Sequence, residues 1–232
     1  MRKTGVISDV HGNFSALVEV VAFLRFEGCE RIVCLGDICG YYPLVNECIE
    51  LLRREQVECI KGNHDAFILG ESSCDRSKSA MDCIAYQKKV INQDNLGWIA
   101  SLGEVVRFDE CLGVHGGLRD HLDEYVQDFD FKAATRDHPG VKVFLTGHTH
   151  IQQIQHAHGL VYCNPGSVGQ PRDHDPKAAC AIIDKGGIAL HRVEYPIERT
   201  AAAMKAAGFS DYYYGNLYHG CRIGERRGLD ER

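Results

Sequence analysis

The sequence lacks the features that mark several broad classes of protein. It has no CxxC pair, and its eleven cysteines are an odd number scattered over 232 residues, so a disulfide framework is not expected. We expect reduced cysteines, mostly buried as small hydrophobic residues in a reducing compartment. The sequence also shows no signal peptide, transmembrane stretch or internal repeat, so a cytoplasmic location without a membrane partner is the expectation.

The chain also lacks an excess of positive charge. Its formal net charge is −6, so a stable nucleic-acid partner is not expected. With 44% hydrophobic residues, a chain of this length can bury a substantial core as one domain spanning residues 1–232. An acidic protein that handled a phosphate anion would need a local cation, and a metal ion supplies one.

The first 60 residues alternate between buried strands and amphipathic helices. This order predicts βαβ units and a parallel sheet with right-handed crossovers. The segment at about 66–102 reads as a helical cap or insertion, and 225–232 as a frayed tail. Later residues are expected to be rich in strands, with a hairpin near 104–114. The remaining expected helices are Val126–Arg136, Ile197–Ala207 and Tyr212–Leu217.

Five apolar strands each end in a short run of side chains that can bind metals. In α/β folds, ligands bind at the carboxyl ends of strands, so we expect the five runs to converge. Carboxylate, imidazole and amide ligands together suit Mn, Fe or Zn and suit Ca poorly. The runs are Asp9-Val10-His11, Gly36-Asp37, Gly62-Asn63-His64-Asp65, Val114-His115-Gly116 and Gly147-His148-Thr149-His150.

Two metal ions about 3.5–4 Å apart need a shared ligand and would orient a phosphate between them. Asp37 stands alone at its strand end and is the natural bridge. The glycines before Asp37, Asn63 and His148 are expected to allow sharp backbone turns.

In these motifs, in this order, the sequence resembles the calcineurin-like metallophosphoesterases. The stretch from Asn164 to Arg172 resembles a loop of small prokaryotic phosphodiesterase-like members, so the likeness covers about residues 5–193. It implies an α/β (α+β) fold: a four-layer αββα sandwich with two mixed sheets and a dinuclear metal site at the strand-end loops. Each metal ion would be divalent or trivalent.

The resemblance also implies a role for each motif residue. Asp37 bridges the ions, and in-line attack on phosphorus comes from a metal-bound water or hydroxide. His64 is a catalytic non-ligand beside the leaving group, as general acid or as donor to the transition-state charge, and Asp65 orients it. The ligands of the first metal are Asp9, His11 and His150, and those of the second are Asn63, His115 and His148.

The residues directly after Asp37 bear on the choice of substrate. Protein serine/threonine phosphatases and symmetrical dinucleoside-tetraphosphate hydrolases of this superfamily carry an arginine there, in G-D-x-x-x-R-G. This chain has Tyr41 and Tyr42 instead, which favours a phosphodiester or pyrophosphate-type substrate. Arg172 and Tyr41 are candidate substrate-binding residues. The alternative for Arg172 is an exposed cation in a surface loop, and the alternative for Tyr41 is simple packing.

We therefore expect a phosphodiesterase or broad-specificity phosphoesterase, with nucleotides among the candidate substrates. A protein or small-molecule phosphomonoesterase and a dinucleoside polyphosphate hydrolase are the alternatives within the enzymes. A non-catalytic metal-binding scaffold is the alternative outside them. The sequence leaves the oligomeric state open.

Overall fold

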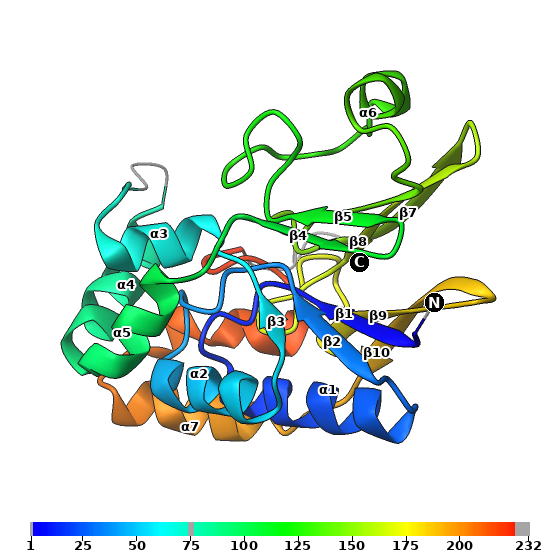
Figure 1. Ribbon diagram of the computed structural model, residues 1–232. Coiled ribbons are helices and arrows are strands. Elements are labelled where there is room, and N and C mark those ends of the chain that lie inside the picture. Colours follow the sequence, from blue (N-terminus) through cyan, green and yellow to red (C-terminus); the bar gives the residue numbers. More distant parts are fainter. Residues whose placement is uncertain (1, 74–76, 226–232) are drawn as a thin grey trace, which may run out of the picture.

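The computed structural model describes residues 2–73 and 77–225. Two five-stranded mixed sheets lie face to face (Figure 1). The first has the order β10-β9-β1-β2-β3, and the second β4-β5-β6-β8-β7. The strands are β1 (Thr4–Ile7), β2 (Arg31–Cys34), β3 (Glu58–Cys59), β4 (Val105–Phe108), β5 (Cys111–Val114), β6 (Val143–Leu145), β7 (Gln152–Ala157), β8 (Leu160–Pro165), β9 (Ala178–Asp184) and β10 (Gly187–Val193).

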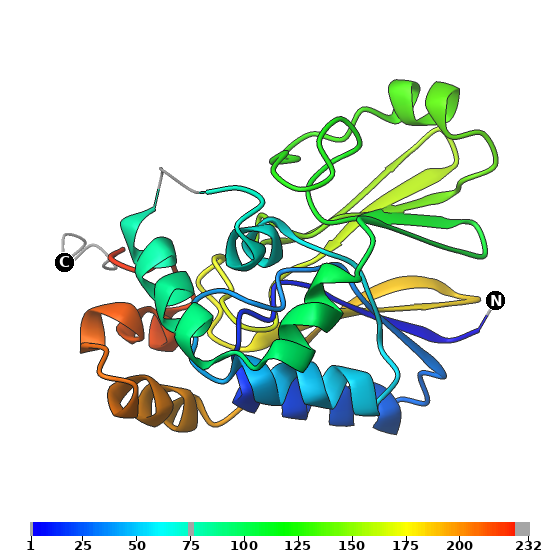
Figure 2. The same cartoon turned by 60° about the vertical axis from the view of Figure 1, so that its left-hand side comes forward.

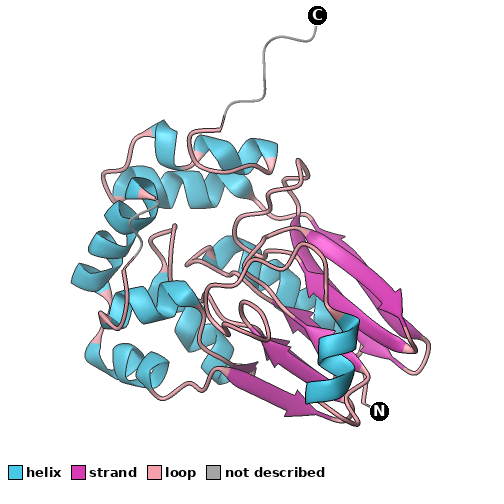
Figure 3. Ribbon diagram, turned by 90° about the horizontal axis from the view of Figure 1, so that it is seen from above, coloured by secondary structure: helices cyan, strands magenta, loops and turns pink. Residues whose placement is uncertain are grey.

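Helices lie along the outer face of the first sheet, whereas irregular segments and one short helix lie over the outer face of the second (Figure 1). The α/β architecture with two mixed sheets is confirmed. Figure 3 shows the strands gathered on one side and most helices on the other, with strand-end loops between them. The helices are α1 (Phe14–Phe26), α2 (Val45–Arg54), α3 (Asn63–Leu69), α4 (Lys78–Val90), α5 (Gln93–Ala100), α6 (Phe131–Asp137) and α7 (Ile197–Ala206), with 3-10 helices η1 (Asp211–Tyr213) and η2 (Gly215–His219).

Each sheet contains three neighbouring parallel strands. β1, β2 and β3 run parallel in the first sheet, as expected from the alternation of strands and helices. β5, β6 and β8 run parallel in the second. Side chains such as Val6, Val33, Phe108 and Leu145 fill the space between the sheets. The carboxyl ends of both parallel sets therefore lie on the same side of this shared core.

The segment from 117 to 130 differs from its expected form. We expected a helix over Val126–Arg136, but the helix begins only at Phe131, where Asp130 caps it. Upstream, the Phe129 ring stacks on Tyr162 at 4.7 Å, and its backbone N–H donates to Gln155 Oε1. These tertiary contacts satisfy the backbone and bury the apolar side chain without a helix.

The C-terminal region also differs in detail. The expected helix Tyr212–Leu217 is two 3-10 helices, because Tyr214 (φ −135°) leaves the helical conformation between them. This region lies beside α4, where the Tyr213 hydroxyl donates to Asp82 (Figure 2). The expected frayed tail lies outside the described residues except for Glu225.

Two composition-based expectations can be compared with the fold. The ten cysteines in the described part of the chain are free, and all but Cys59 are buried, as expected. No helix within residues 2–73 and 77–225 is both long and apolar enough to cross a bilayer.

Candidate metal centre

The strand-end side chains meet in one buried cluster. Their ligand atoms fall into two groups, and within each group the atoms lie within 4.8 Å of one another. Asp37 belongs to both groups, which is the geometry that a bridging ligand requires. The groups are Asp9, His11, Asp37 and His150, and Asp37, His115 and His148.

Asn63 joins the second group through its side-chain amide. Its Oδ1 lies 3.0 Å from His115 Nε2, and both residues are buried. Asn63 is the first residue of α3, so the motif expected in a strand-end loop occupies the first turn of a helix. All seven residues that the sequence suggested as metal ligands are therefore brought together.

The backbone at the cluster adopts a conformation that side chains rarely tolerate. Five of these residues have left-handed φ angles between 53° and 66°. Such conformations cost about 1–3 kcal/mol each and persist where the surrounding structure imposes them. These conformations therefore lower the stability of the fold, but they direct the side chains into the cluster. The five are Asp9, His11, Asp37, His148 and His150.

Glycines make room for this geometry in two different ways. Gly36 has a φ of +96° and makes the sharp turn that the sequence suggested before Asp37. Gly62 has an ordinary φ of −106°, but a Cβ there would lie 2.2 Å from Asp37 Oδ1. Gly62 is therefore needed for close approach, and the expected turn is not its role.

Three histidines are oriented through their Nδ1 atoms. His11 Nδ1 donates to Cys39 O at 2.9 Å, and His115 Nδ1 donates to Leu35 O at 2.9 Å. His150 Nδ1 donates to the carbonyl of residue 170 at 2.6 Å. A carbonyl only accepts, so Nδ1 carries the hydrogen, and Nε2 of a neutral ring presents its lone pair to the cluster. This is the tautomer that a metal-binding histidine uses.

The packing of these ligand atoms fits a bound cation. His11 Nε2 and His150 Nε2 face each other at 3.1 Å, so two lone pairs of neutral rings would point at one another. Buried Asp9 Oδ1 makes no hydrogen bond, although it lies 3.2 Å from His150 Nε2. Buried polar atoms without partners are costly, and a cation between them removes that cost.

The pKa values of the buried histidines shift in opposite directions. Burial is the largest single influence on His115 and opposes its protonation, but the charges of Asp37 and Asp9 and the hydrogen bonds with Asp37 and Leu35 together outweigh burial and raise its pKa to about 10. Burial lowers the pKa of His148 to about 3 and that of His11 well below its usual value. The metal-free cluster thus compensates its carboxylates with a proton on His115, which a metal ion would displace.

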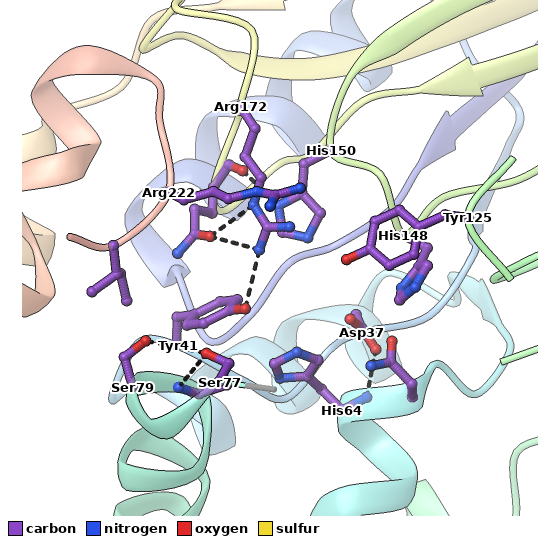
Figure 4. Close-up of a pocket in the computed structure, with 14 residues that line it drawn as sticks. Asp37, Tyr41, His64, Ser77, Ser79, Tyr125, His148, His150, Arg172 and Arg222 are labelled. Carbon is purple, nitrogen blue, oxygen red and sulfur yellow. Dashed lines mark hydrogen bonds between the residues drawn. The ribbon is translucent and has the colours of Figure 1, made fainter. Parts of the chain in front are cut away.

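His64 lies beside the ligands and lines a cavity of about 450 Å³ (Figure 4). Its ring packs against those of His11 and Tyr41, at 4.7 and 4.9 Å between centroids. Its backbone N–H donates to Asp37 Oδ1, whereas its buried Nδ1 has no hydrogen-bond partner. Burial lowers the pKa of His64 to about 4. A neutral imidazole whose Nδ1 has no hydrogen-bond partner therefore lies next to the cluster.

Asp65 has a different role from the one expected. Its carboxylate accepts hydrogen bonds from the backbone N–H groups of Ile38, Cys39 and Gly62, and it makes none with the His64 ring. It therefore joins the loop that carries Asp37 to the turn that carries Asn63. Burial and the nearby charge of Asp37 raise its pKa to about 6, against these backbone bonds.

Tyr41 and Arg172, the two candidates for substrate contact, both line the cavity. Arg172 Nη2 donates to the Tyr41 hydroxyl at 3.0 Å (Figure 4). Sequence reasoning missed Tyr125 and Arg222, which also line it. Both come from irregular segments without a motif, so the sequence carried no signal for them.

Comparison with known proteins agrees with this geometry. Residues 2–186 match the family model of the calcineurin-like phosphoesterase superfamily domain. The protein MJ0912 of Methanocaldococcus jannaschii is 35% identical, over 84% of this chain and 88% of that protein. The crystal structure of a metallophosphoesterase from Sphaerobacter thermophilus is 30% identical, covering 94% of this chain and 99% of that one, with a TM-score of 0.79.

The crystal structure of hypothetical protein PH1004 from Pyrococcus horikoshii OT3 shares the fold. Its TM-score is 0.82, with 21% identity over 95% of this chain and 99% of that one. The shared fold, the family match over most of the chain and the buried ligand cluster lead to one assignment. The chain belongs to the calcineurin-like phosphoesterase superfamily.

Proposed function

We propose that this protein hydrolyses phosphate esters at the buried cluster, as a phosphodiesterase or broad-specificity phosphoesterase with nucleotides among its candidate substrates. The observation that carries the proposal is the pair of ligand groups that share Asp37 at the floor of the cavity. Two Mn, Fe or Zn ions held there would neutralise phosphoryl oxygens and lower the pKa of a water molecule. Asp9, His11 and His150 would hold one ion, and Asn63, His115 and His148 the other.

The reaction adds water to phosphorus and breaks the P–O bond to the leaving group, whose oxygen gains a proton. His64 would assist that oxygen; the proposal is supported by its position in the cavity lining beside Asp37. Its lowered pKa favours a neutral ring that donates a hydrogen bond over a positively charged ring that transfers a proton. Asp65 would support this step indirectly, by joining the backbone that follows Asp37 to the turn at Gly62.

Arg172 qualifies the argument from the missing arginine after Asp37. The guanidinium of Arg172 lies 5.7 Å above the Tyr41 ring, so an arginine from another segment reaches the same cavity. A guanidinium fork suits a phosphomonoester dianion well. This observation favours phosphomonoester hydrolysis as the second candidate function.

A substrate panel on the Mn-loaded protein tests the proposal. It contains an aryl phosphodiester, the matching monoester, cyclic nucleotides, dinucleoside polyphosphates and a phosphopeptide. We expect turnover of the diester at least comparable to that of the monoester. A strong preference for the monoester or the phosphopeptide would refute the diester assignment.

Metal content separates an enzyme from a scaffold in the same samples. Bound metal without turnover of any ester would support the scaffold alternative, whereas the proposal expects metal and turnover together. Elemental analysis of the purified protein would identify the ions. Absence of tightly bound metal at any supplementation would contradict the whole proposal.

A further inference from the structure

We propose that Arg172 and Arg222 form a second anion-binding subsite, so that the substrate carries a second phosphate group besides the one that reacts. This inference rests on the proposed function and narrows its substrate class. The reacting phosphate would lie at the ligand cluster, and the second phosphate beside it, at the two arginines.

The charges on the cavity wall are the first observation. Among residues 2–73 and 77–225, the charged side chains that line the cavity are Asp37, Arg172 and Arg222, besides the histidines of the centre. Asp37 belongs to the proposed metal centre, so the other two charges of this described lining are positive. Figure 4 shows both arginines on the side of the cavity where His150 lies, with Asp37 and His64 on the other side. A ligand that spans the cavity therefore meets positive charge at both ends.

Arg172 is held by neutral groups. Its Nε and Nη2 donate to Gln170 Oε1 at 3.1 and 2.9 Å, and Nη2 also donates to the Tyr41 hydroxyl. Within residues 2–73 and 77–225, its side-chain hydrogen bonds go to these neutral groups. A guanidinium that neutral groups hold in place is a preorganised partner for phosphate.

Arg222 is tied to the same framework through the buried Tyr42 hydroxyl. That hydroxyl accepts from Gln170 Nε2 at 3.2 Å and from Asn216 Nδ2 at 3.3 Å. Asn216 Nδ2 also donates to the carbonyl of Cys221, the residue directly before Arg222. One hydroxyl thus links the residue that fixes Arg172 to the turn that precedes Arg222.

Charge balance explains why the two arginines exceed what one phosphate needs. Two divalent ions would bring four positive charges, Asp9 and Asp37 would offset two of them, and an attacking hydroxide would offset a third. The remaining positive charge matches the single negative charge of a reacting phosphodiester. Arg172 and Arg222 then add two positive charges that a second phosphate would balance. The cavity of about 450 Å³ lies within the range of about 300–1,000 Å³ for small-molecule sites, and a nucleotide-sized ligand suits it.

The position of Arg222 in the chain supports a role in substrate specificity. The family model ends at residue 186, so Arg222 comes from a segment beyond the matched domain. Chemistry shared across the family must reside within the matched residues, whereas substrate choice can be added outside them.

Phosphate binding to the metal-free protein tests the subsite without relying on activity. We expect titration calorimetry to detect inorganic phosphate and pyrophosphate binding after the metals are chelated and removed. Arg222→Gln should weaken that binding by about 10- to 100-fold, the effect of losing charge-assisted hydrogen bonds. Arg199→Gln is the matched control, because Arg199 is exposed on α7 and does not line the cavity. Absence of metal-free binding, or equal effects of both variants, would overturn the subsite.

Turnover by the Mn-loaded protein tests the substrate class. Thymidine 5′-(p-nitrophenyl phosphate) is compared with its 3′-phosphorylated form, and a nucleoside monophosphate aryl ester with the corresponding diphosphate ester. We expect kcat/KM to be about 10- to 100-fold higher for at least one of the two-phosphate esters, with the advantage reduced in Arg222→Gln relative to Arg199→Gln. If neither extra phosphate raises kcat/KM, the second subsite is refuted, while the proposed phosphoesterase function stands. If no ester is hydrolysed, the proposed function fails, and the binding measurement still decides on the subsite.

Discussion

Replacing Gly62 with alanine tests the geometry of the metal centre with a single methyl group. The backbone angles of Gly62 (φ −106°, ψ 179°) suit any residue, so Gly62→Ala introduces no backbone strain. The new Cβ would lie 2.2 Å from Asp37 Oδ1 and 2.4 Å from Asp37 N, whereas ordinary contact begins at 3.4 Å. Asp37 or the turn at Gly62 must therefore move by about 1 Å.

A shift of that size at the shared ligand should disable the centre. Misplacement by about 1 Å can cost about 10²-fold in rate, and overpacking costs about 1–3 kcal/mol of stability. We expect kcat/KM for an aryl phosphodiester to fall by at least that factor at saturating Mn. The metal content should also fall, and the metal-free protein should unfold at a lower temperature.

Gly97→Ala is the control for this substitution. Gly97 lies inside α5, and a Cβ there would meet no atom within 4 Å. Alanine should therefore leave activity unchanged and stabilise the protein by about 0.5–1 kcal/mol, as expected inside a helix. If Gly62→Ala retained activity within about threefold and a normal unfolding temperature, the approach of Gly62 to Asp37 would be refuted.

Four further substitutions or conditions separate the roles of the site residues. His64→Ala should keep the metal content but lower turnover by about 10²-fold or more, and an unchanged rate would remove His64 from the mechanism. Asp37→Ala should abolish both metals in elemental analysis, because Asp37 belongs to both ligand groups, and retention of both ions would exclude a bridge. Asp65→Asn should lower the free energy of unfolding by about 1–3 kcal/mol, since three backbone N–H groups lose a carboxylate acceptor, and a loss of turnover at unchanged stability would contradict this role. In the metal-free protein, the pKa of His115 rises from 6.5 to about 10, so its stabilising contribution is full below pH 6.5 and is lost as the pH rises towards 10. Titrating Mn into weakly buffered protein at pH 8 should release this proton, and no release would show that His115 is already neutral.

The identity of the proposed ligands could be predicted from the sequence because it depends on a simple topological rule. Parallel strands present their carboxyl ends on one side of a sheet, so polar runs that follow apolar strands converge. Asp9 follows β1, Asp37 follows β2 and His115 follows β5, and the structure places all three within the cluster. Neither the rule nor the resemblance required knowledge of the loops.

The local conformations of the same residues could not be predicted. Left-handed φ angles at Asp9, His11 and Asp37 oppose the intrinsic preference of side-chain-bearing residues. Tertiary contacts impose them, for example the hydrogen bond from His11 N to Asp37 O at 2.8 Å. The backbone preference of one segment carries no information about contacts that a distant segment makes with it.

Asp65 shows how neighbours in sequence can mislead. Its position directly after His64 suggested that its carboxylate orients the His64 ring. Both residues lie in the first turn of α3, however, and adjacent residues of a helix point in different directions. The carboxylate therefore turns to the backbone of Cys39 and Gly62. The sequence did not reveal that the helix begins at Asn63, and this start decides which groups the Asp65 carboxylate can reach.

The arginine that is missing after Asp37 leads to a more general point about substrate prediction. Its absence from one motif favoured a phosphodiester or pyrophosphate-type substrate. The fold nevertheless brings Arg172, already a candidate from the sequence, into the cavity from a distant segment, and it brings Arg222 from beyond the family domain. A motif records the charge of one segment, whereas a substrate responds to the summed charge of every segment that lines the cavity. Since Arg172 is fixed by Gln170 and Tyr41, its charge belongs to the site as firmly as an arginine in the motif would. The choice of substrate must therefore be argued from the lining of the cavity, and that lining favours a ligand with more than one phosphate.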